Sequence, residues 1–314
     1  MKQNIADLAR YRWQGILMRL GIPENYLTGR HGPCPLCPDG GKDRYMFTNK
    51  DDNGMYYCHQ CGAGNGFHLL MRFHNWDFKQ TAREVEKIVG DVKQSEPKQK
   101  TDPMVRLRNI QVACRNLTDD CSVTRYLRNR GLSRYPESIQ TARLPYYKQG
   151  ENVGEFDTMV AKVVSVDNKP LTYHLTYTED GAKADVTPTR KVMSPVSPIA
   201  GGAVRLFRLD CHTDRNKNAH LAIAEGIETA LAVHELTDAP CWSVLSAVGM
   251  ESFQVPAGVA KLTIYADNDN NFTGQKAAYT LANRLALEGN VDVNVCVPVL
   301  AGRDWLDVLM EEAG

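Results

Sequence analysis

The sequence predicts a multidomain protein that combines α+β and α/β architecture. Three observations predict it. Two Cys-x-x-Cys pairs lie within the first 61 residues, a polar stretch with two prolines follows at residues 90–103, and the C-terminal third alternates short apolar strands with helices. A chain of 314 residues suits two or three domains.

Composition shifts divide the chain into four predicted segments. Residues 90–103 are almost free of apolar side chains, so they cannot pack a core and predict a linker. We therefore expect a small N-terminal domain, a linker, a basic middle region of mixed α+β structure and a C-terminal α/β domain. Their predicted ranges are residues 1–90, 91–103, 104–215 and 216–314.

Two helical segments are predicted on either side of the linker. Asp77 is placed to cap a helix at residues 78–89, whose apolar side chains recur at helical spacing and which Gly90 ends. Residues 104–131 also have a helical pattern, and Gly131 closes it. The second helix therefore opens the middle region.

Strands dominate the rest of the middle region. Residues 160–166 and 171–177 alternate and are rich in β-branched and aromatic side chains, which predicts strands around turns at 167–168 and 179–181. In the C-terminal domain, strands are predicted at residues 221–224, 241–246, 262–266 and 291–297, and helices at 227–236, 273–287 and 304–310. Alternating helices and buried strands favour a mainly parallel sheet covered on both faces.

Composition limits where in the cell the protein can be expected. Apolar residues make up 43% of the chain, yet no apolar run reaches the roughly 18 residues that span a bilayer. Residues 1–12 are polar and lack the apolar core of a signal peptide. These features predict a cytoplasmic protein without a membrane partner. In that compartment, nine cysteines are better interpreted as metal ligands or buried thiols than as disulfides.

Charge is unevenly distributed although the net charge is zero. Residues 221–314 hold 13 acidic and 4 basic residues, so the preceding residues carry an excess of nine positive charges. A basic front suits a phosphate backbone and an acidic back suits metal cations. Ordinary solvated surface charge would give the same asymmetry, so nucleic acid is one of two open interpretations here.

Four cysteines have the spacing of a zinc site. Cys34 and Cys37 form one Cys-x-x-Cys pair, and Cys58 and Cys61 form another after twenty intervening residues. Two such knuckles supply the tetrahedral sulfur cage that zinc prefers, with no position left for catalysis. The metal is therefore predicted to be structural. His31 and His59 are alternative ligands, and a redox dithiol is the competing interpretation.

The segment between the knuckles predicts a hairpin, as in a zinc ribbon. It mixes cations with aromatic rings, a combination that suits a single strand whose bases stack while its phosphates pair with charge. The candidates for contact with a single strand are Lys42, Arg44, Tyr45, Phe47, Tyr56 and Tyr57.

Acidic residues follow two strands of the predicted parallel sheet. Glu225 ends one strand, and Asp267 and Asp269 end another. Ligand sites form at the carboxyl ends of such strands, and converging carboxylates repel each other unless a hard cation such as magnesium lies between them. One or two such ions activate a hydroxyl and stabilise leaving pyrophosphate. Asp304 either caps the last helix or adds a fourth carboxylate.

These motifs resemble a known family. Glu225-Gly226 followed by Asp267-x-Asp269 resembles the TOPRIM domain of topoisomerases and bacterial-type primases, and Ala-Glu-Gly-Ile-Glu-Thr-Ala-Leu-Ala is similar to the version in phage and plasmid primases. His31-Gly-Pro-Cys-Pro-Leu-Cys and Cys58-His-Gln-Cys-Gly-Ala-Gly-Asn-Gly resemble the zinc ribbon of satellite-phage primase–helicase proteins. The segments around Gly131, Lys183 and Arg190 are similar to the basic middle region of the same proteins.

The resemblance implies a DNA primase of a phage, plasmid or other mobile element, acting in a bacterial host cell. It implies that Glu225 is the catalytic acidic residue of the family and that Asp267 and Asp269 hold magnesium or manganese. Single-stranded DNA template, ribonucleoside triphosphates and a separate replicative helicase or replication protein are the implied partners. Lys183, Arg190 and Lys191 become candidates for guiding template and nucleotides, although exposed strand charge explains them equally well.

The sequence also departs from the family pattern. The first knuckle, Cys37-Pro-Asp-Gly-Gly, holds an extra residue, and Thr229 stands where cellular primases often have a second acid. Glu228 is nearby, but helix geometry directs it elsewhere. No Gly-x-x-x-x-Gly-Lys-Ser/Thr phosphate loop is present, so no helicase motor is expected in this chain.

Three other functions stay open at this point. A TOPRIM nuclease or a RecR-like repair protein would use the same acidic site. A DNA-binding zinc ribbon joined to an inactive TOPRIM domain would need none of the carboxylates. Substitution of Glu225 by glutamine separates the enzymatic from the binding functions.

Overall fold

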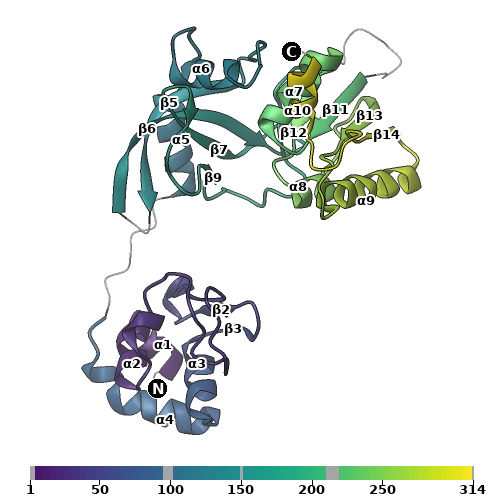
Figure 1. Cartoon of the computed structure of the whole chain (residues 1–314). Helices are drawn as coiled ribbons and strands as arrows, with labels where there is room; N and C mark the ends of the chain where they lie inside the picture. The colour runs from purple at the N-terminus through teal and green to yellow at the C-terminus, as the bar shows by residue number, and fades with distance from the viewer. Residues whose placement is uncertain (1–3, 95–101, 149–150, 210–218, 313–314) are drawn as a thin grey trace. The chain divides into compact units, whose positions relative to one another are not determined.

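The computed structural model describes residues 4–94, 102–148, 151–209 and 219–312 (Figure 1). The chain forms two compact units, Met1–Lys100 and Thr101–Gly314. Most of the predicted linker, residues 95–101, lies outside the described residues. The predicted domain boundaries therefore stay predictions. No helix among the described ranges has the length and apolar character needed to cross a bilayer.

The first unit is a zinc-ribbon-like sheet surrounded by helices. Its sheet is antiparallel, with β2 between β1 and β3, and Tyr57 of β2 pairs with Met46 and Ala63. The strands are β1 (Tyr45–Phe47), β2 (Tyr56–Cys58) and β3 (Gly62–Gly64). The helices are α1 (Ile5–Ala9), α2 (Trp13–Arg19), η1 (Glu24–Tyr26), η2 (Lys50–Asp52), α3 (Gly66–His74), α4 (Phe78–Ile88) and η3 (Val89–Asp91).

Aromatic packing and helix capping organise this unit. Trp13 of α2 meets Phe67 of α3 edge-on, with 4.7 Å between ring centroids. Gly66 makes this approach possible, because a β-carbon there would lie 2.0 Å from the Trp13 ring. The predicted cap is confirmed, since the Asp77 carboxylate accepts from the Gln80 N–H at 2.6 Å and α4 follows directly.

The second unit is built on one sheet, which has eleven strands among the described residues. Its order is β14-β13-β11-β12-β10-β6-β5-β4, and β7 pairs with β6, β8 and β9. The first strands are β4 (Arg115–Asn116), β5 (Ile139–Lys148), β6 (Glu151–Val164), β7 (Pro170–Glu179), β8 (Ala182–Lys183) and β9 (Arg190–Val192). The later strands are β10 (Ala203–Val204), β11 (Ala219–Ala224), β12 (Cys241–Ser243), β13 (Val259–Tyr265) and β14 (Asp292–Cys296).

Strand direction changes within this sheet. The neighbouring strands β12, β11, β13 and β14 run parallel to one another. The strands from β4 to β10 pair in antiparallel fashion. Strand β10 joins the two parts of the sheet, because it pairs with both β6 and β12. The helices are α5 (Pro103–Ala113), α6 (Ser122–Arg128), α7 (Ile227–Thr237), α8 (Ala247–Ser252), α9 (Thr273–Glu288) and α10 (Trp305–Glu312). The predicted fold class, with a largely parallel C-terminal sheet, is confirmed.

Two features of the middle region differ from the sequence prediction. The helical pattern expected at residues 104–131 is confirmed only in part, because α5 ends at Ala113, Arg115–Asn116 then pairs with β5, and a second helix follows at Ser122–Arg128. The Cys121 side chain caps α6 by accepting from the Thr124 N–H, so the polar stretch between the helices acts as a connection and cap. The long strand β5 was not predicted at all.

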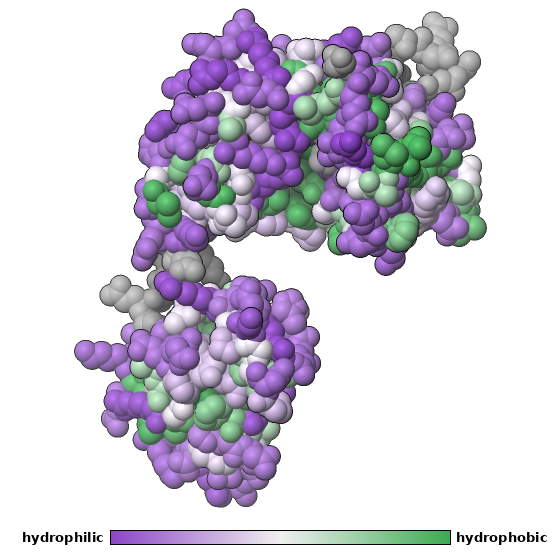
Figure 2. Space-filling view, viewed as in Figure 1, coloured by the Kyte–Doolittle hydropathy of each residue, from purple (hydrophilic) through white to green (hydrophobic). Residues whose placement is uncertain are grey.

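Hydrophobic packing joins the middle region to the C-terminal part. One core holds Tyr126 and Leu127 of α6, Met159 of β6, Leu231 of α7 and Leu306 of α10. A second core lies under α8 and α9 on the parallel strands. Most of the face in Figure 2 is hydrophilic, but hydrophobic residues gather at the end that carries the parallel strands. Exposed apolar side chains of that part include Phe272, Val299 and Leu300.

Candidate functional site

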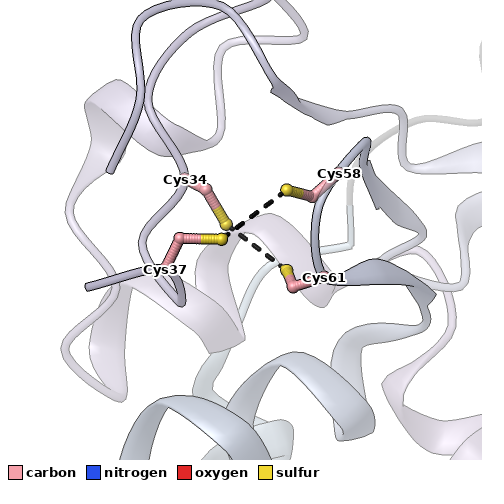
Figure 3. A group of neighbouring side chains, drawn as sticks. All are labelled: Cys34, Cys37, Cys58 and Cys61. Carbon is pink, nitrogen blue, oxygen red and sulfur yellow. Dashed lines mark hydrogen bonds between the residues drawn. The ribbon is translucent and has the colours of Figure 1, made fainter. Parts of the chain in front are cut away.

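The four cysteines meet at one point of the first unit. Their sulfur atoms all lie within 4.8 Å of one another (Figure 3). The Cys34–Cys61 sulfurs are 3.6 Å apart and the Cys37–Cys58 sulfurs 3.9 Å apart. A tetrahedron with zinc–sulfur bonds of about 2.3 Å has edges of about 3.8 Å, so the cage fits zinc. His31 and His59 are not part of this group.

The environment of the thiols favours a bound cation. Burial, then hydrogen bonds with the three neighbouring thiols, raises the pKa of Cys37. Burial alone would also raise the pKa of Cys58, but bonds from the Cys61 and Gln60 backbone lower it to about 7. The Leu36 N–H points at the Cys34 sulfur at 3.4 Å. A zinc ribbon with four cysteines therefore supports a structural zinc ion.

The ribbon surface differs from the sequence prediction in its aromatic residues. Tyr45, Phe47 and Tyr56 are no more than 3% exposed, so the expectation that they stack on a single strand is wrong. A unit this small needs these rings for its own core, and Tyr45 stacks on Tyr56. Tyr57 is 42% exposed, and its hydroxyl lies 3.1 Å from Nδ1 of His59.

The two predicted ribbon cations are in different situations. Lys42 is exposed. Arg44 is held by both oxygens of Asp39, at 3.0 and 3.2 Å, and its guanidinium lowers the pKa of that carboxyl. Asp39 belongs to the first knuckle, so this knuckle holds Arg44 in place through the ion pair.

In the second unit, Glu225 follows β11 at its carboxyl end. The Glu225 carbonyl accepts from the Leu245 N–H at 2.8 Å and from the Ser243 hydroxyl at 2.7 Å, which fixes its backbone beside β12. Gly226 then turns the chain into α7. Burial, followed by the charge of Asp269, raises the pKa of Glu225.

Asp267 and Asp269 leave the adjacent strand β13 in a braced loop. Oδ2 of Asp269 accepts from the Gly274 N–H at 2.9 Å, at the start of α9. A β-carbon on Gly274 would lie 2.9 Å from the Asp267 carbonyl, so glycine permits this close approach. Asn268 lies between the two aspartates in the sequence. Its side-chain amide donates to the Pro298 carbonyl at 2.8 Å and so ties the loop to the segment before α10.

The sequence left two roles open for Asp304, capping of the last helix and an additional carboxylate for the acidic site, and the contacts of Asp304 are compatible with both. Its Oδ1 accepts from the Leu306 and Asp307 N–H groups at 2.9 Å, so it caps α10. Asp307 completes the cap by accepting from the Asp304 N–H at 3.2 Å. Both carboxylates also act on Asp267. Asp307 was not predicted, although the Asp-x-x-Asp spacing is a capping signal.

Asp267 lies at the centre of this carboxylate cluster, which comprises Glu225, Asp267, Asp269, Asp304 and Asp307. Burial, then the charges of the other four residues, raises its pKa to about 7. Its Oδ1 is buried and has no hydrogen-bond partner among the described residues. An orphaned buried oxygen amid repelling carboxylates is the environment that a hard divalent cation would stabilise. Carboxylate oxygens are the donor type that suits magnesium or manganese, although among the described residues only the four cysteines have their ligand atoms gathered as closely as a bound ion requires.

Three cations from the middle region influence one another near these acids. Burial, then Arg190 and Arg130, lowers the pKa of Lys183, while the charges of Glu228 and Asp304 oppose that shift. Arg130 was missed from the sequence. It lies over the Tyr126 ring, and its buried Nε has no partner in the described part of the chain.

Arg190 and Lys191 lie on opposite faces of β9. Lys191 is placed over the Tyr146 ring, 3.3 Å from the centroid, and donates to the Tyr147 carbonyl at 2.6 Å. Arg190 instead donates from Nη2 to Oε1 of Glu228 at 2.8 Å. Glu228 therefore points toward the middle region, and its charge is not among the causes of the raised pKa of Glu225 or of Asp267.

Comparison with protein families divides the chain into three matched segments. Residues 29–67 match the zinc-binding domain of primase-helicase, and residues 220–314 match the Toprim domain. Residues 102–206 match a domain of unknown function (DUF7146). The chain therefore contains a primase-type zinc ribbon and a Toprim domain.

Several solved structures resemble the chain at low identity. The Aquifex aeolicus primase, with zinc-binding and RNA polymerase domains, is 15% identical, with a TM-score of 0.45 over 99% of this chain and 83% of that one. A DNA primase domain from Pseudomonas aeruginosa is 12% identical, with a TM-score of 0.42 over 61% and 68%. The primase fragment of the bacteriophage T7 primase-helicase is 16% identical, with a TM-score of 0.37 over 90% and 98%.

Proposed function

We propose that this chain is a DNA primase, which copies single-stranded DNA into short RNA primers from ribonucleoside triphosphates. One observation carries the proposal: a primase-type zinc ribbon and a Toprim domain with an intact carboxylate cluster occur in one chain. A nuclease or a repair protein would also use the carboxylates. The primase-type ribbon favours primer synthesis over both.

The carboxylate cluster is the proposed catalytic centre. Glu225, Asp267 and Asp269 would hold magnesium or manganese, and Asp304 would shape the site from the start of α10. Bound there, two such ions would activate the attacking 3′-hydroxyl and stabilise the leaving pyrophosphate. The chain's own contribution is rigidity, because backbone bonds fix Glu225, the 267–269 loop and Asp304 before any ligand binds.

Cations outside the cluster are the proposed contacts for phosphates and template. Lys183 and Arg190 come from the strands β8 and β9, and both lie within electrostatic reach of Glu228 and each other. They would bind the phosphates of nucleotide or template. The role of Lys191 stays a prediction, and its contacts with Tyr146 and Tyr147 favour a structural part as well.

The zinc ribbon is the proposed template-reading surface. Its zinc would be structural, because all four ligands are sulfur and leave no open position. Tyr57 offers an exposed ring for base stacking, and Lys42 and the fixed Arg44 offer positive charge.

Replication of a mobile element is the proposed setting. The family matched by the ribbon is named for primase-helicase proteins, and the T7 protein noted above is the primase fragment of one. We infer that a separate replicative helicase or replication protein cooperates with this chain.

Template-directed synthesis tests the proposal. Purified protein would be incubated with varied single-stranded DNAs, labelled ribonucleotides and magnesium or manganese, with Glu225→Gln as the matched variant. Short labelled RNAs from the wild type alone are expected. Metal-dependent shortening of the DNA without synthesis would instead identify a nuclease, and binding without either reaction would identify a recognition module.

A further inference from the structure

Helix α7 carries a second acidic residue whose surroundings differ from those of the catalytic cluster. Glu228 follows Glu225 by three positions, yet its side chain is 4% exposed and faces the middle region. Its Oε1 accepts from the Tyr126 hydroxyl at 2.7 Å and from Arg190 at 2.8 Å. Residues from α6, β9 and α7 thus meet in one contact, which is buried at Tyr126 and Glu228 and partly exposed at Arg190.

We propose that Glu228 is a positioning residue that holds Arg190 in the orientation needed to bind the triphosphate of an incoming nucleotide. This inference rests on the proposed function. It assigns Glu228 neither to the metal nor to the reacting atoms, since the residue acts through Arg190.

The Arg190 side chain needs a contact that fixes its orientation. Its strand, β9, has three residues and pairs only with β7 among the described strands, so its backbone alone gives a long side chain little guidance. The Arg190 side chain is 44% exposed, whereas Glu228 is almost fully buried. A guanidinium has five N–H donors, so a bond from Nη2 to Glu228 leaves other donors available on the exposed side.

Charge in this region indicates what the exposed donors would bind. Burial, then the charges of Arg190 and Arg130, lowers the pKa of Lys183, so three cations lie within electrostatic reach at this place. Glu228 is a buried carboxylate among these cations. Burial alone would raise its pKa, but the charge of Arg190 and the hydrogen bonds from Tyr126 and Arg190 lower the pKa to about 2. Glu228 therefore stays charged. Glu228 and Asp304 both act on Lys183, and two carboxylates do not neutralise three cations. An anion with several charges and acceptor oxygens, such as a triphosphate, would complete the balance.

Glu235 provides a matched control on the same helix. It also reaches from α7 to the middle region, where it accepts from the Ser133 N–H at 2.5 Å and the Arg134 N–H at 2.8 Å. These contacts brace the two parts without involving Arg190. Loss of Glu235 therefore measures a loosened interface alone.

The experiment compares full-length wild type with Glu228→Gln, Glu235→Gln and Tyr126→Phe. The probe is a ribonucleoside triphosphate with a non-cleavable α,β bond, titrated in magnesium by calorimetry, and manganese binding without nucleotide is measured separately. We expect Glu228→Gln to weaken triphosphate binding at least tenfold, Tyr126→Phe less, and Glu235→Gln less than twofold. Manganese affinity should stay unchanged. Melting temperatures show that each variant is folded.

The possible outcomes separate the interpretations. Equal losses in Glu228→Gln and Glu235→Gln would overturn the positioning role and leave a structural brace. Loss of manganese binding in Glu228→Gln would overturn it in favour of a metal ligand, and a wild type that binds no triphosphate would also overturn it. If triphosphate binding depends on Glu228 but no primer is made, the proposed function fails while the positioning role stands.

Discussion

Replacing Asp267 by asparagine is expected to stabilise the metal-free protein while abolishing its activity. The pKa of Asp267 rises from 3.8 to about 7 because of burial and four neighbouring carboxylates. Each tenfold change in proton affinity corresponds to about 1.4 kcal/mol, so ionised Asp267 costs the fold at most about 4 kcal/mol. Partial exposure of the cluster screens this charge, and we therefore expect a gain of about 2 kcal/mol for Asp267→Asn.

The pH dependence of this gain follows from the direction of the shift. A pKa raised in the folded state means that the folded protein binds the proton more tightly. The contribution of Asp267 to stability is therefore full below pH 3.8 and is lost as pH rises through about 7. The asparagine variant should match the wild type near pH 4 and exceed it at pH 8.

Thermal melting in magnesium-free buffer measures this effect, without chelators so that zinc is retained. A gain of about 2 kcal/mol corresponds to about 4–8 °C for a unit of this size. Asp292→Asn, at an exposed carboxylate of β14, is the control and should not shift the transition at pH 8. Saturating magnesium should remove the advantage of Asp267→Asn. Equal melting temperatures at pH 8, or the same gain at pH 4, would refute the crowded-carboxylate reasoning.

Three further predictions concern the first unit. Cys58→Ser should lose zinc and unfold the first unit while the second unit melts unchanged, as metal analysis and circular dichroism would show; retained zinc would contradict the four-sulfur site. Gly66→Ala places a β-carbon 2.0 Å from the Trp13 ring, so denaturant unfolding of the first unit should reveal a loss of about 1–3 kcal/mol, and unchanged stability would disprove that contact. Tyr57→Ala should weaken binding to single-stranded DNA by about 1–3 kcal/mol in fluorescence anisotropy if one base stacks on the ring, whereas an unchanged Kd would remove Tyr57 from the interface.

Local patterns predicted the C-terminal part of the fold well. Each predicted strand and helix after residue 220 is present within a few residues, because a buried parallel strand and its covering helix have different apolar periods. The helix α8 was missed, since it has six residues and its main signal is the Ser246 cap. The long strand β5 was missed because Pro145 and its polar residues interrupt the strand pattern.

Some features of the site also follow from local sequence patterns, whereas others depend on contacts between residues far apart in the chain. The positions of Glu225 and Asp267 follow from strand order, since the strands β11 and β13 are parallel neighbours. The contact of Glu228 with Arg190 and Tyr126 joins residues 38 and 102 positions apart, so no local pattern contains it. Burial of Tyr45 was equally hard to predict, because this short hairpin buries Tyr45, Phe47 and Tyr56 but exposes Tyr57, and the sequence does not mark the difference.

Formation of the first phosphodiester bond tests the central claim most directly. Wild-type protein and Glu225→Gln, matched by melting temperature and zinc content, would receive single-stranded DNA, ribonucleoside triphosphates and magnesium, and products would be identified by mass spectrometry. We predict a triphosphate-bearing ribodinucleotide from the wild type that is absent from the variant. Equal dinucleotide formation by both proteins would contradict catalysis at the carboxylate cluster, and none from the wild type on any template would contradict the assignment of this chain as a primase.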